Sequence, residues 1–146
     1  MDRFETFTLL ISSISRSRRR IKTEAMRKFN LKSPHVKCLY YLYRGEKLTS
    51  KELTDLCEED KAAISRSLDY LELNQYIYCE SQAKKRYKDY LHLTEKGIEV
   101  GKYIADTIEN ILDISSKGVN EEEREIMYKC LNLICINLKN VLEKGE

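Results

Sequence analysis

The sequence predicts a mainly α-helical (α+β) fold, with long N- and C-terminal helices on either side of a central unit of short helices and strands. Apolar residues recur at helical spacing over most of the 146 residues. Two segments rich in Tyr, Ile and Leu, residues 76–82 and 87–93, show partial period-two alternation instead. A chain of this length fits one domain, so we expect residues 1–146 to form a single folded unit.

The composition excludes several classes of protein. With 34% charged and 42% hydrophobic residues, the chain has the balance of a globular protein rather than of a disordered segment. No apolar run approaches the roughly 18 residues of a membrane-spanning helix, and the N-terminal stretch lacks a signal-peptide pattern. Five cysteines without CxxC spacing indicate neither a disulfide framework nor a zinc site. We therefore expect a cytoplasmic protein with reduced thiols, no metal, no cofactor and no membrane partner.

The first two predicted helices are marked by their ends. Asp2 is placed to cap a long amphipathic helix that continues to Phe29. Ser33 followed by Pro34 is typical of a helix start, and Gly45 is a natural stop for that second helix.

The next two helices are short and separated by a turn. Thr49 and Glu52 have the spacing of a capping box, which predicts a helix from about Ser50 to near Cys57. The acidic run Glu58-Glu59-Asp60 then offers a new N-cap for a helix from Lys61 to about Leu73.

The remaining elements follow without a break. The two strands are joined by the loop 83–86. Thr94 is placed to cap a fifth helix that reaches Lys117 and stops at Gly118. Asn120 and Glu123 repeat the capping box and begin a sixth helix that extends to Lys144.

A short helix, a turn, a second helix and a hairpin make a winged helix-turn-helix, which we place at residues 33–94. The helix 61–73 divides into an apolar side and a small, polar and basic side. The apolar side carries Ile64, Leu68 and Leu71, and the other carries Lys61, Ala62, Ser65, Arg66 and Asp69. A helix in a DNA major groove needs short side chains for close approach and long donors for base edges, which Arg66 and Lys61 supply.

The predicted hairpin tip is strongly basic. Residues 84–88 hold four positive charges and no acid, which suits phosphate contact or a narrow minor groove. Its candidate DNA-contacting residues are Lys84, Lys85, Arg86 and Lys88. A basic loop alone, or a mixed-charge helix face alone, is also typical of a solvated surface. It is their order and spacing together that favour binding to double-stranded DNA.

The terminal segments 1–30 and 95–146 carry more apolar surface than one chain can bury. The fifth helix has two apolar stripes, and the sixth has a wide apolar face. We therefore expect a homodimer whose terminal helices interlock. Its two copies of the helix 61–73, the recognition helices that would enter the DNA major groove, are expected to lie about 34 Å apart. The expected interface residues are Phe4, Phe7, Ile11, Ile126, Cys130, Leu133, Ile134, Leu138 and Val141.

Three segments together resemble the MarR-type transcriptional regulators. These are residues 60–72 (DKAAISRSLDYLE), the basic hairpin after them, and residues 91–97 (LHLTEKG). The similarity extends to the layout of nearly the whole chain. The resemblance implies a dimeric winged-helix regulator, in our reading a repressor, that binds pseudo-palindromic operator DNA. Such regulators often release DNA when they bind a small ligand or are oxidised.

The resemblance also assigns residues by position. It places Arg86 in the minor groove, and Lys61, Ala62, Ala63, Ser65, Arg66 and Ser67 in the major groove. Thr49 and Ser50, at the start of the preceding helix, complete the expected DNA-contacting set. The chain departs from the family in two places. Lys84 stands where an acid is usual, and the glycine after the recognition helix is missing, so that Asn74 is expected to take its left-handed conformation.

Three alternatives stay open. Cys38 lies three residues after His35, so it is either a thiol sensor activated by the imidazole or an ordinary core residue. His35, Tyr40 and Tyr41 either line an effector pocket or pack in the core. A winged helix that binds proteins instead of DNA is the alternative function. An enzyme is not expected, because the sequence has only two histidines and no phosphate loop, nucleophile elbow or metal-ligand spacing.

Overall fold

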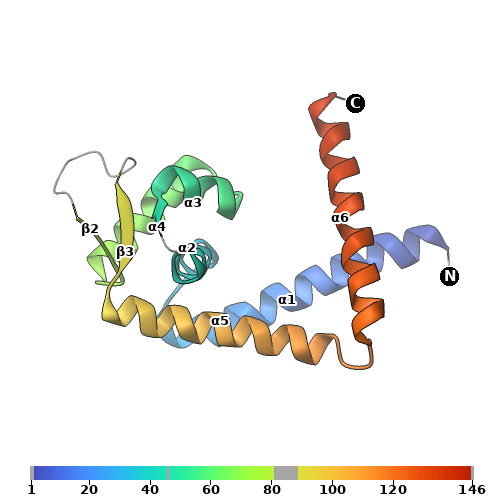
Figure 1. Ribbon diagram of the computed structural model, residues 1–146, viewed down its shortest axis with the longest axis horizontal. Helices are drawn as coiled ribbons and strands as arrows, with labels where there is room; N and C mark the ends of the chain where they lie inside the picture. The colour runs from blue at the N-terminus through green and yellow to red at the C-terminus, as the bar shows by residue number, and fades with distance from the viewer. Residues whose placement is uncertain (1, 46, 81–88, 146) are drawn as a thin grey trace. The chain divides into compact units, whose positions relative to one another are not determined.

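The computed structural model describes residues 2–45, 47–80 and 89–145 (Figure 1). The described chain falls into two compact units, Met1–Asn110 and Ile111–Glu146. Its elements in chain order are a π-helix η1 (Phe4–Leu9), α1 (Leu10–Met26), a 3-10 turn η2 (Arg27–Phe29), α2 (Ser33–Arg44), β1 (Leu48–Thr49), α3 (Ser50–Cys57), α4 (Lys61–Leu73), β2 (Ile77–Cys79), β3 (Tyr90–Leu93), α5 (Glu95–Ser115) and α6 (Glu121–Glu143).

The N-terminal helix spans the predicted range, although its ends differ from an α-helix. The Asp2 side chain caps the first turn, since its Oδ1 accepts a hydrogen bond from the Glu5 N–H at 2.8 Å. The first six residues have π-helical geometry and the last three are 3-10. Asn30, with φ of 56°, takes the left-handed conformation that ends this helix.

The start of α2 differs by one residue from the prediction. Lys32, not Ser33, occupies the N-cap position, and Ser33 and Pro34 form the first turn. His35 Nδ1 accepts a hydrogen bond from the Lys32 N–H at 3.0 Å. Burial, assisted by the positive charge of Lys32, lowers the pKa of His35 below its usual value. The imidazole therefore stays neutral, which is the state that can accept this bond.

The two short helices begin and end where the sequence predicts. The capping box of α3 is formed in both directions, with Glu52 N–H donating to Thr49 Oγ1 at 3.2 Å and Thr49 N–H donating to Glu52 Oε2 at 2.8 Å. Asp60 Oδ1 accepts from the Ala63 N–H at 2.7 Å and caps α4. Between them Glu58, at φ of 54°, makes the turn.

The sheet has three antiparallel strands in the order β1-β3-β2. Leu48 pairs with Leu91, and Ile77 pairs with Leu93. The two predicted strands are present as β2 and β3, and the part of the predicted hairpin at residues 81–88 lies outside the described residues. Strand β1 was not predicted, because two residues are too short to show alternation.

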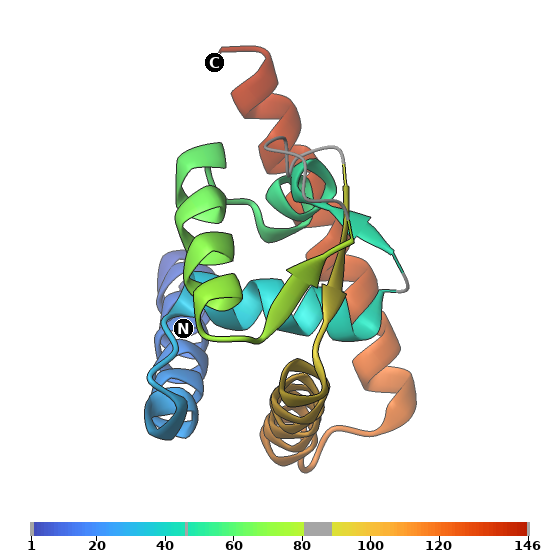
Figure 2. The same ribbon diagram turned by 90° about the vertical axis from the view of Figure 1, so that its left-hand side faces the viewer.

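The core of the first unit lies around α2. Figure 2 shows α2 running across the middle of this unit, with α3 and α4 on one side and α1 and α5 on the other. Its fully buried side chains come from all of these helices and include Met26, Leu39, Leu53, Leu68 and Ile104. The first half of α5 approaches α2 closely because Gly101 has no side chain: a Cβ there would lie 2.9 Å from the Cβ of Tyr43.

The second unit consists of the end of α5 and the whole of α6. Its turn contains Gly118 at φ of 92°, and the predicted capping box follows. Asn120 Oδ1 accepts from the Glu123 N–H, and Glu123 Oε2 accepts from the Asn120 N–H, both at 2.9 Å. None of the side chains of α6 is buried within the described chain. In the described part of the chain, no helix has the length and apolarity needed to span a membrane.

Candidate nucleic-acid interface

Helix α4 is divided between core and solvent as the sequence predicts. Ile64, Leu68 and Leu71 are fully buried in the core. The opposite side is exposed, and it carries Lys61, Ala62, Ser65, Arg66 and Asp69. The helix therefore presents a surface of short side chains with two long cationic ones.

One of the α4 residues expected to contact DNA is buried instead of exposed on this surface. Ser67 is only 4% exposed, and its hydroxyl donates to the Ala63 carbonyl at 2.8 Å. The placement of Ser67 toward DNA, which came from the resemblance, therefore differs from the structure. Ser67 follows Ile64 by three residues, which puts both on the buried side of the helix. Ala63 is half-buried at the border of the exposed surface.

Helix α4 is fixed to the connection between α1 and α2. The Tyr70 hydroxyl donates to the Asn30 carbonyl at 2.9 Å. The Tyr70 ring also stacks on His35, with ring centroids 4.2 Å apart and 14° between the planes. These contacts set the orientation of the exposed α4 surface relative to α2.

The turn after α4 corrects one prediction. Asn74 has φ of −91°, so it does not take the left-handed conformation. Gln75 takes it instead, with φ of 63°. Local propensity alone favours an Asn for this conformation, but the carbonyls of both Asn74 and Gln75 accept hydrogen bonds from residues about twenty positions later, which sequence propensity does not take into account.

The other expected DNA-contacting residues lie at the start of α3 or in the predicted hairpin tip. Thr49 and Ser50 are half-buried at the start of α3, where the Thr49 side chain serves as the helix cap. The basic residues of the predicted hairpin tip, which would form the wing of a winged helix, are Lys84, Lys85, Arg86 and Lys88, and they lie outside the described residues.

The residues considered for an effector pocket are packed in or against the core. His35 is 8% exposed. Tyr40 and Tyr41 are half-buried and pack against each other edge to face, with ring centroids 5.4 Å apart. Their role in ligand binding stays a prediction.

Cys38 has the setting of a core residue. It is fully buried, and its thiol is hydrogen-bonded to the sulfur of Cys57. That hydrogen bond and the burial raise the pKa of Cys38 well above its usual value. Because the thiolate is the reactive form, this environment favours the core interpretation over the thiol sensor.

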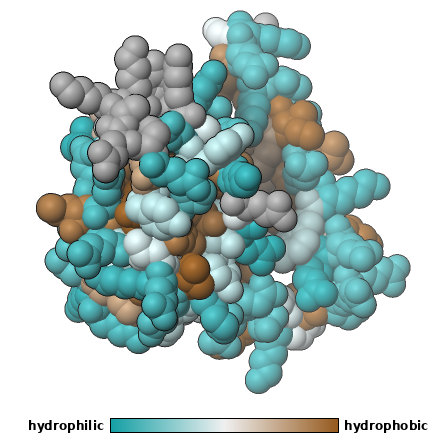
Figure 3. All heavy atoms as spheres, turned by 60° about the vertical axis from the view of Figure 1, so that its left-hand side comes forward, coloured by the Kyte–Doolittle hydropathy of each residue, from teal (hydrophilic) through white to brown (hydrophobic). Residues whose placement is uncertain are grey.

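The residues expected at a dimer interface lie on surfaces that the chain itself leaves open. Phe4 is 64% exposed, and the other predicted apolar residues of η1, α1 and α6 are exposed or half-buried. Figure 3 shows one face of the chain, on which hydrophilic residues predominate and apolar residues form separate patches.

Comparisons with known proteins bear on the fold. No protein-family model matches the sequence, and the comparison with curated proteins finds no match. Among solved structures, the MarR-family regulator NMB1585 from Neisseria meningitidis is 15% identical, with 100% of each chain covered and a TM-score of 0.79. A MarR-family regulator from Silicibacter pomeroyi is 20% identical over 92% of this chain and 91% of that chain, with a TM-score of 0.77.

A third solved structure contains DNA. In the S. aureus MepR–DNA complex, MepR is 21% identical over 90% of this chain and 97% of its own, with a TM-score of 0.77. The chain has the winged-helix fold of the MarR-family transcriptional regulators.

Proposed function

We propose that the protein is a MarR-type transcriptional regulator, a ligand-responsive homodimeric repressor that binds specific double-stranded DNA. The observation that carries the proposal is the exposed surface of α4, which holds Ala62 and Ser65 beside Lys61 and Arg66. Arg66 can donate two hydrogen bonds to the O6 and N7 atoms of a guanine, and the small neighbours permit close approach to the groove. The MepR–DNA complex, which has the same fold, supports the proposal by analogy.

The first test concerns Arg66. We expect Arg66→Ala to reduce discrimination at one base position by about 1 to 3 kcal/mol, because a lost bidentate contact removes base recognition but few phosphate contacts. The measurement is the affinity for a duplex selected from genomic fragments, compared with variants of that duplex at each position.

Lys85→Ala is the matched control for Arg66→Ala. Lys85 lies in the predicted hairpin tip, where it would contact a phosphate. Loss of that contact would weaken binding to all duplexes alike and reduce the dependence of binding on salt. Equal losses on selected and random duplexes for Arg66→Ala contradict its role in base recognition. A salt-independent affinity for all duplexes favours the protein-binding alternative.

A second chain is proposed as the partner of the exposed apolar helices. The terminal helices contain large side chains that remain solvent-exposed, among them Phe7 at 45% and Leu138 at 56%. Large apolar side chains exposed in such numbers on the helices of a chain are typical of a protein–protein interaction site. A two-fold dimer would also present α4 twice, at the spacing of one DNA turn.

A cavity between α1 and α2 supports a response to a small anionic ligand. Its volume is about 210 Å³, and it is lined by Lys22, Thr23, Met26, Leu31, Lys32, Ser33 and Val36. Burial lowers the pKa of Lys22, and the cations Lys37, Arg18 and Arg19 lower it further. An anion in this cavity would offset that repulsion, while Met26 and Val36 offer contacts to an apolar body.

The second test concerns Lys22. We expect small aliphatic or aromatic monocarboxylates to bind in calorimetric titrations. We expect Lys22→Met to weaken this binding at least about tenfold, because a hydrogen bond to a charged group contributes about 1.5 to 3 kcal/mol. Lys129→Met, an exposed cation in α6, serves as the control and leaves binding unchanged. If the Lys22→Met variant and the unsubstituted protein bind monocarboxylates with equal affinity, the cavity beside Lys22 is not their binding site.

A further inference from the structure

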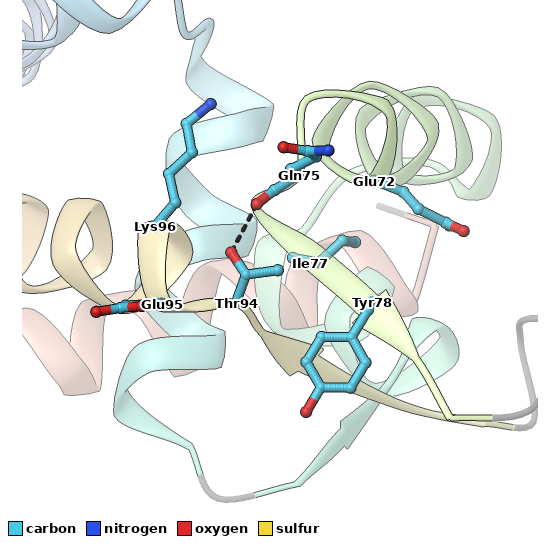
Figure 4. Close-up of a pocket in the computed structure, with 7 residues that line it drawn as sticks. All are labelled: Glu72, Gln75, Ile77, Tyr78, Thr94, Glu95 and Lys96. Carbon is cyan, nitrogen blue, oxygen red and sulfur yellow. Dashed lines mark hydrogen bonds between the residues drawn. The ribbon is translucent and has the colours of Figure 1, made fainter.

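Hydrogen bonds connect the end of the recognition helix α4 to the start of α5. They are accepted by three consecutive main-chain carbonyls, those of residues 74–76. The Lys96 ammonium donates to the Asn74 carbonyl at 2.9 Å. The Thr94 hydroxyl donates to the Gln75 carbonyl at 2.6 Å (Figure 4). The Thr94 N–H donates to the Tyr76 carbonyl at 3.0 Å. Residues about twenty positions apart in the sequence thus fix the chain where it leaves α4.

Two side chains, Thr94 and Lys96, supply contacts that the backbone alone cannot make. The Thr94 hydroxyl also accepts from the Gly97 N–H at 3.0 Å, so one side chain caps α5 and holds the turn after α4. The Lys96 ammonium lies at the carbonyl end of α4, where a positive charge is favoured, and 4.2 Å from the centre of the Tyr76 ring. Figure 4 shows both residues projecting from the start of α5 toward the end of α4.

The turn leaves little room for an alternative arrangement. Gln75 has φ of 63°, a conformation that costs energy for any residue with a Cβ. Gly97 lies so close to the Tyr76 carbonyl that an added Cβ would be 2.0 Å from its oxygen. Helix α5 and the turn are therefore in direct contact, and a displacement of one must move the other.

We propose that Thr94 and Lys96 are positioning residues for the recognition helix, which they couple to α5 through the carbonyls of residues 74–76. The inference rests on the proposed DNA-binding function and adds to it the route by which α5 controls α4. Helix α5 continues toward the segments that we assign to the dimer. A change in its position would therefore alter how the α4 surface meets the groove.

The test compares affinities for a selected duplex and a random duplex of the same length. Thr94→Val removes the hydroxyl at nearly constant shape, Lys96→Met removes the charge and keeps the apolar stem, and Thr94→Ser restores the hydroxyl. We expect the ratio of the two affinities to fall about tenfold for Thr94→Val and for Lys96→Met, since each loses one side-chain hydrogen bond to a carbonyl of the turn, and to recover in Thr94→Ser. If Thr94→Val does not fold, the exposed Lys96→Met variant decides the question.

A purely structural role gives a different result, because a lower folded fraction weakens binding to both duplexes by the same factor. A double-mutant cycle with Arg66→Ala adds a second criterion. If Thr94 acts by positioning the Arg66 side chain, Thr94→Val has little further effect in a protein that already carries Arg66→Ala. The quantity compared is the ratio of the affinities for the selected and the random duplex. Equal effects of Thr94→Val in both backgrounds, or an unchanged ratio, overturn this inference alone. An unsubstituted protein that does not distinguish the duplexes overturns the proposed function, and this inference falls with it.

Discussion

Replacing Gly97 by alanine is expected to destabilise the fold by about 3 kcal/mol or more, at the upper end of the cost of overpacking. The added Cβ would lie 2.0 Å from the Tyr76 carbonyl oxygen, so two backbone segments must separate. A flexible side chain could yield, but a carbonyl held in a turn cannot. The intrinsic helix preference of alanine offsets about 1 kcal/mol of this cost. The measurement is the free energy of unfolding in urea.

Two variants on the same helix isolate the effect at Gly97. Gly101→Ala brings a Cβ to 2.9 Å from the Cβ of Tyr43, a milder clash with a side chain, and should cost less. Glu99 is exposed, so the Glu99→Ala variant reports the effect of helix propensity alone. A Gly97→Ala variant as stable as Glu99→Ala would contradict the close contact between α5 and the turn.

Leu133→Glu is expected to weaken dimerisation at least about 100-fold, which corresponds to about 3 kcal/mol. Leu133 is 51% exposed in the chain, so a charge there leaves the monomer nearly unaffected. In the proposed dimer the same carboxylate is buried against apolar side chains without a partner, which is costly. Sedimentation equilibrium over a range of protein concentrations measures the change.

Asn132→Glu adds the same charge to α6 on a different side. Asn132 is exposed and lies about 100° around the helix from Leu133, away from the apolar face. We expect the dimerisation constant of the Asn132→Glu variant to equal that of the unsubstituted protein. If Leu133→Glu and Asn132→Glu dimerise equally well, the apolar face of α6 is not an interface.

The features that could be predicted from sequence are those fixed by neighbouring residues. The caps at Asp2, Thr49, Asp60 and Asn120 are formed as predicted, because each joins a side chain to a backbone N–H three residues away. The same local geometry divides α4 into buried and exposed sides. Helix boundaries and the candidate DNA-contacting surface followed from these patterns.

The features that were missed depend on contacts distant in the sequence. Strand β1 exists because Leu48 pairs with Leu91, a partner that no spacing rule identifies. Gln75, rather than Asn74, becomes left-handed in a turn whose carbonyls are held by Thr94 and Lys96. Ser67 was assigned to the DNA side by resemblance to a family, although helical spacing from Ile64 places it on the buried side.

In the proposed complex, two copies of the α4 surface contact specific sequences in a DNA duplex. The most direct measurement is fluorescence anisotropy of the purified protein with a duplex selected from genomic fragments and with a shuffled duplex of the same composition. We predict binding of two chains per selected duplex, with an affinity at least about 1000-fold higher than for the shuffled duplex. Equal affinity for both duplexes, or binding of a single chain, would contradict sequence-specific binding by a dimer.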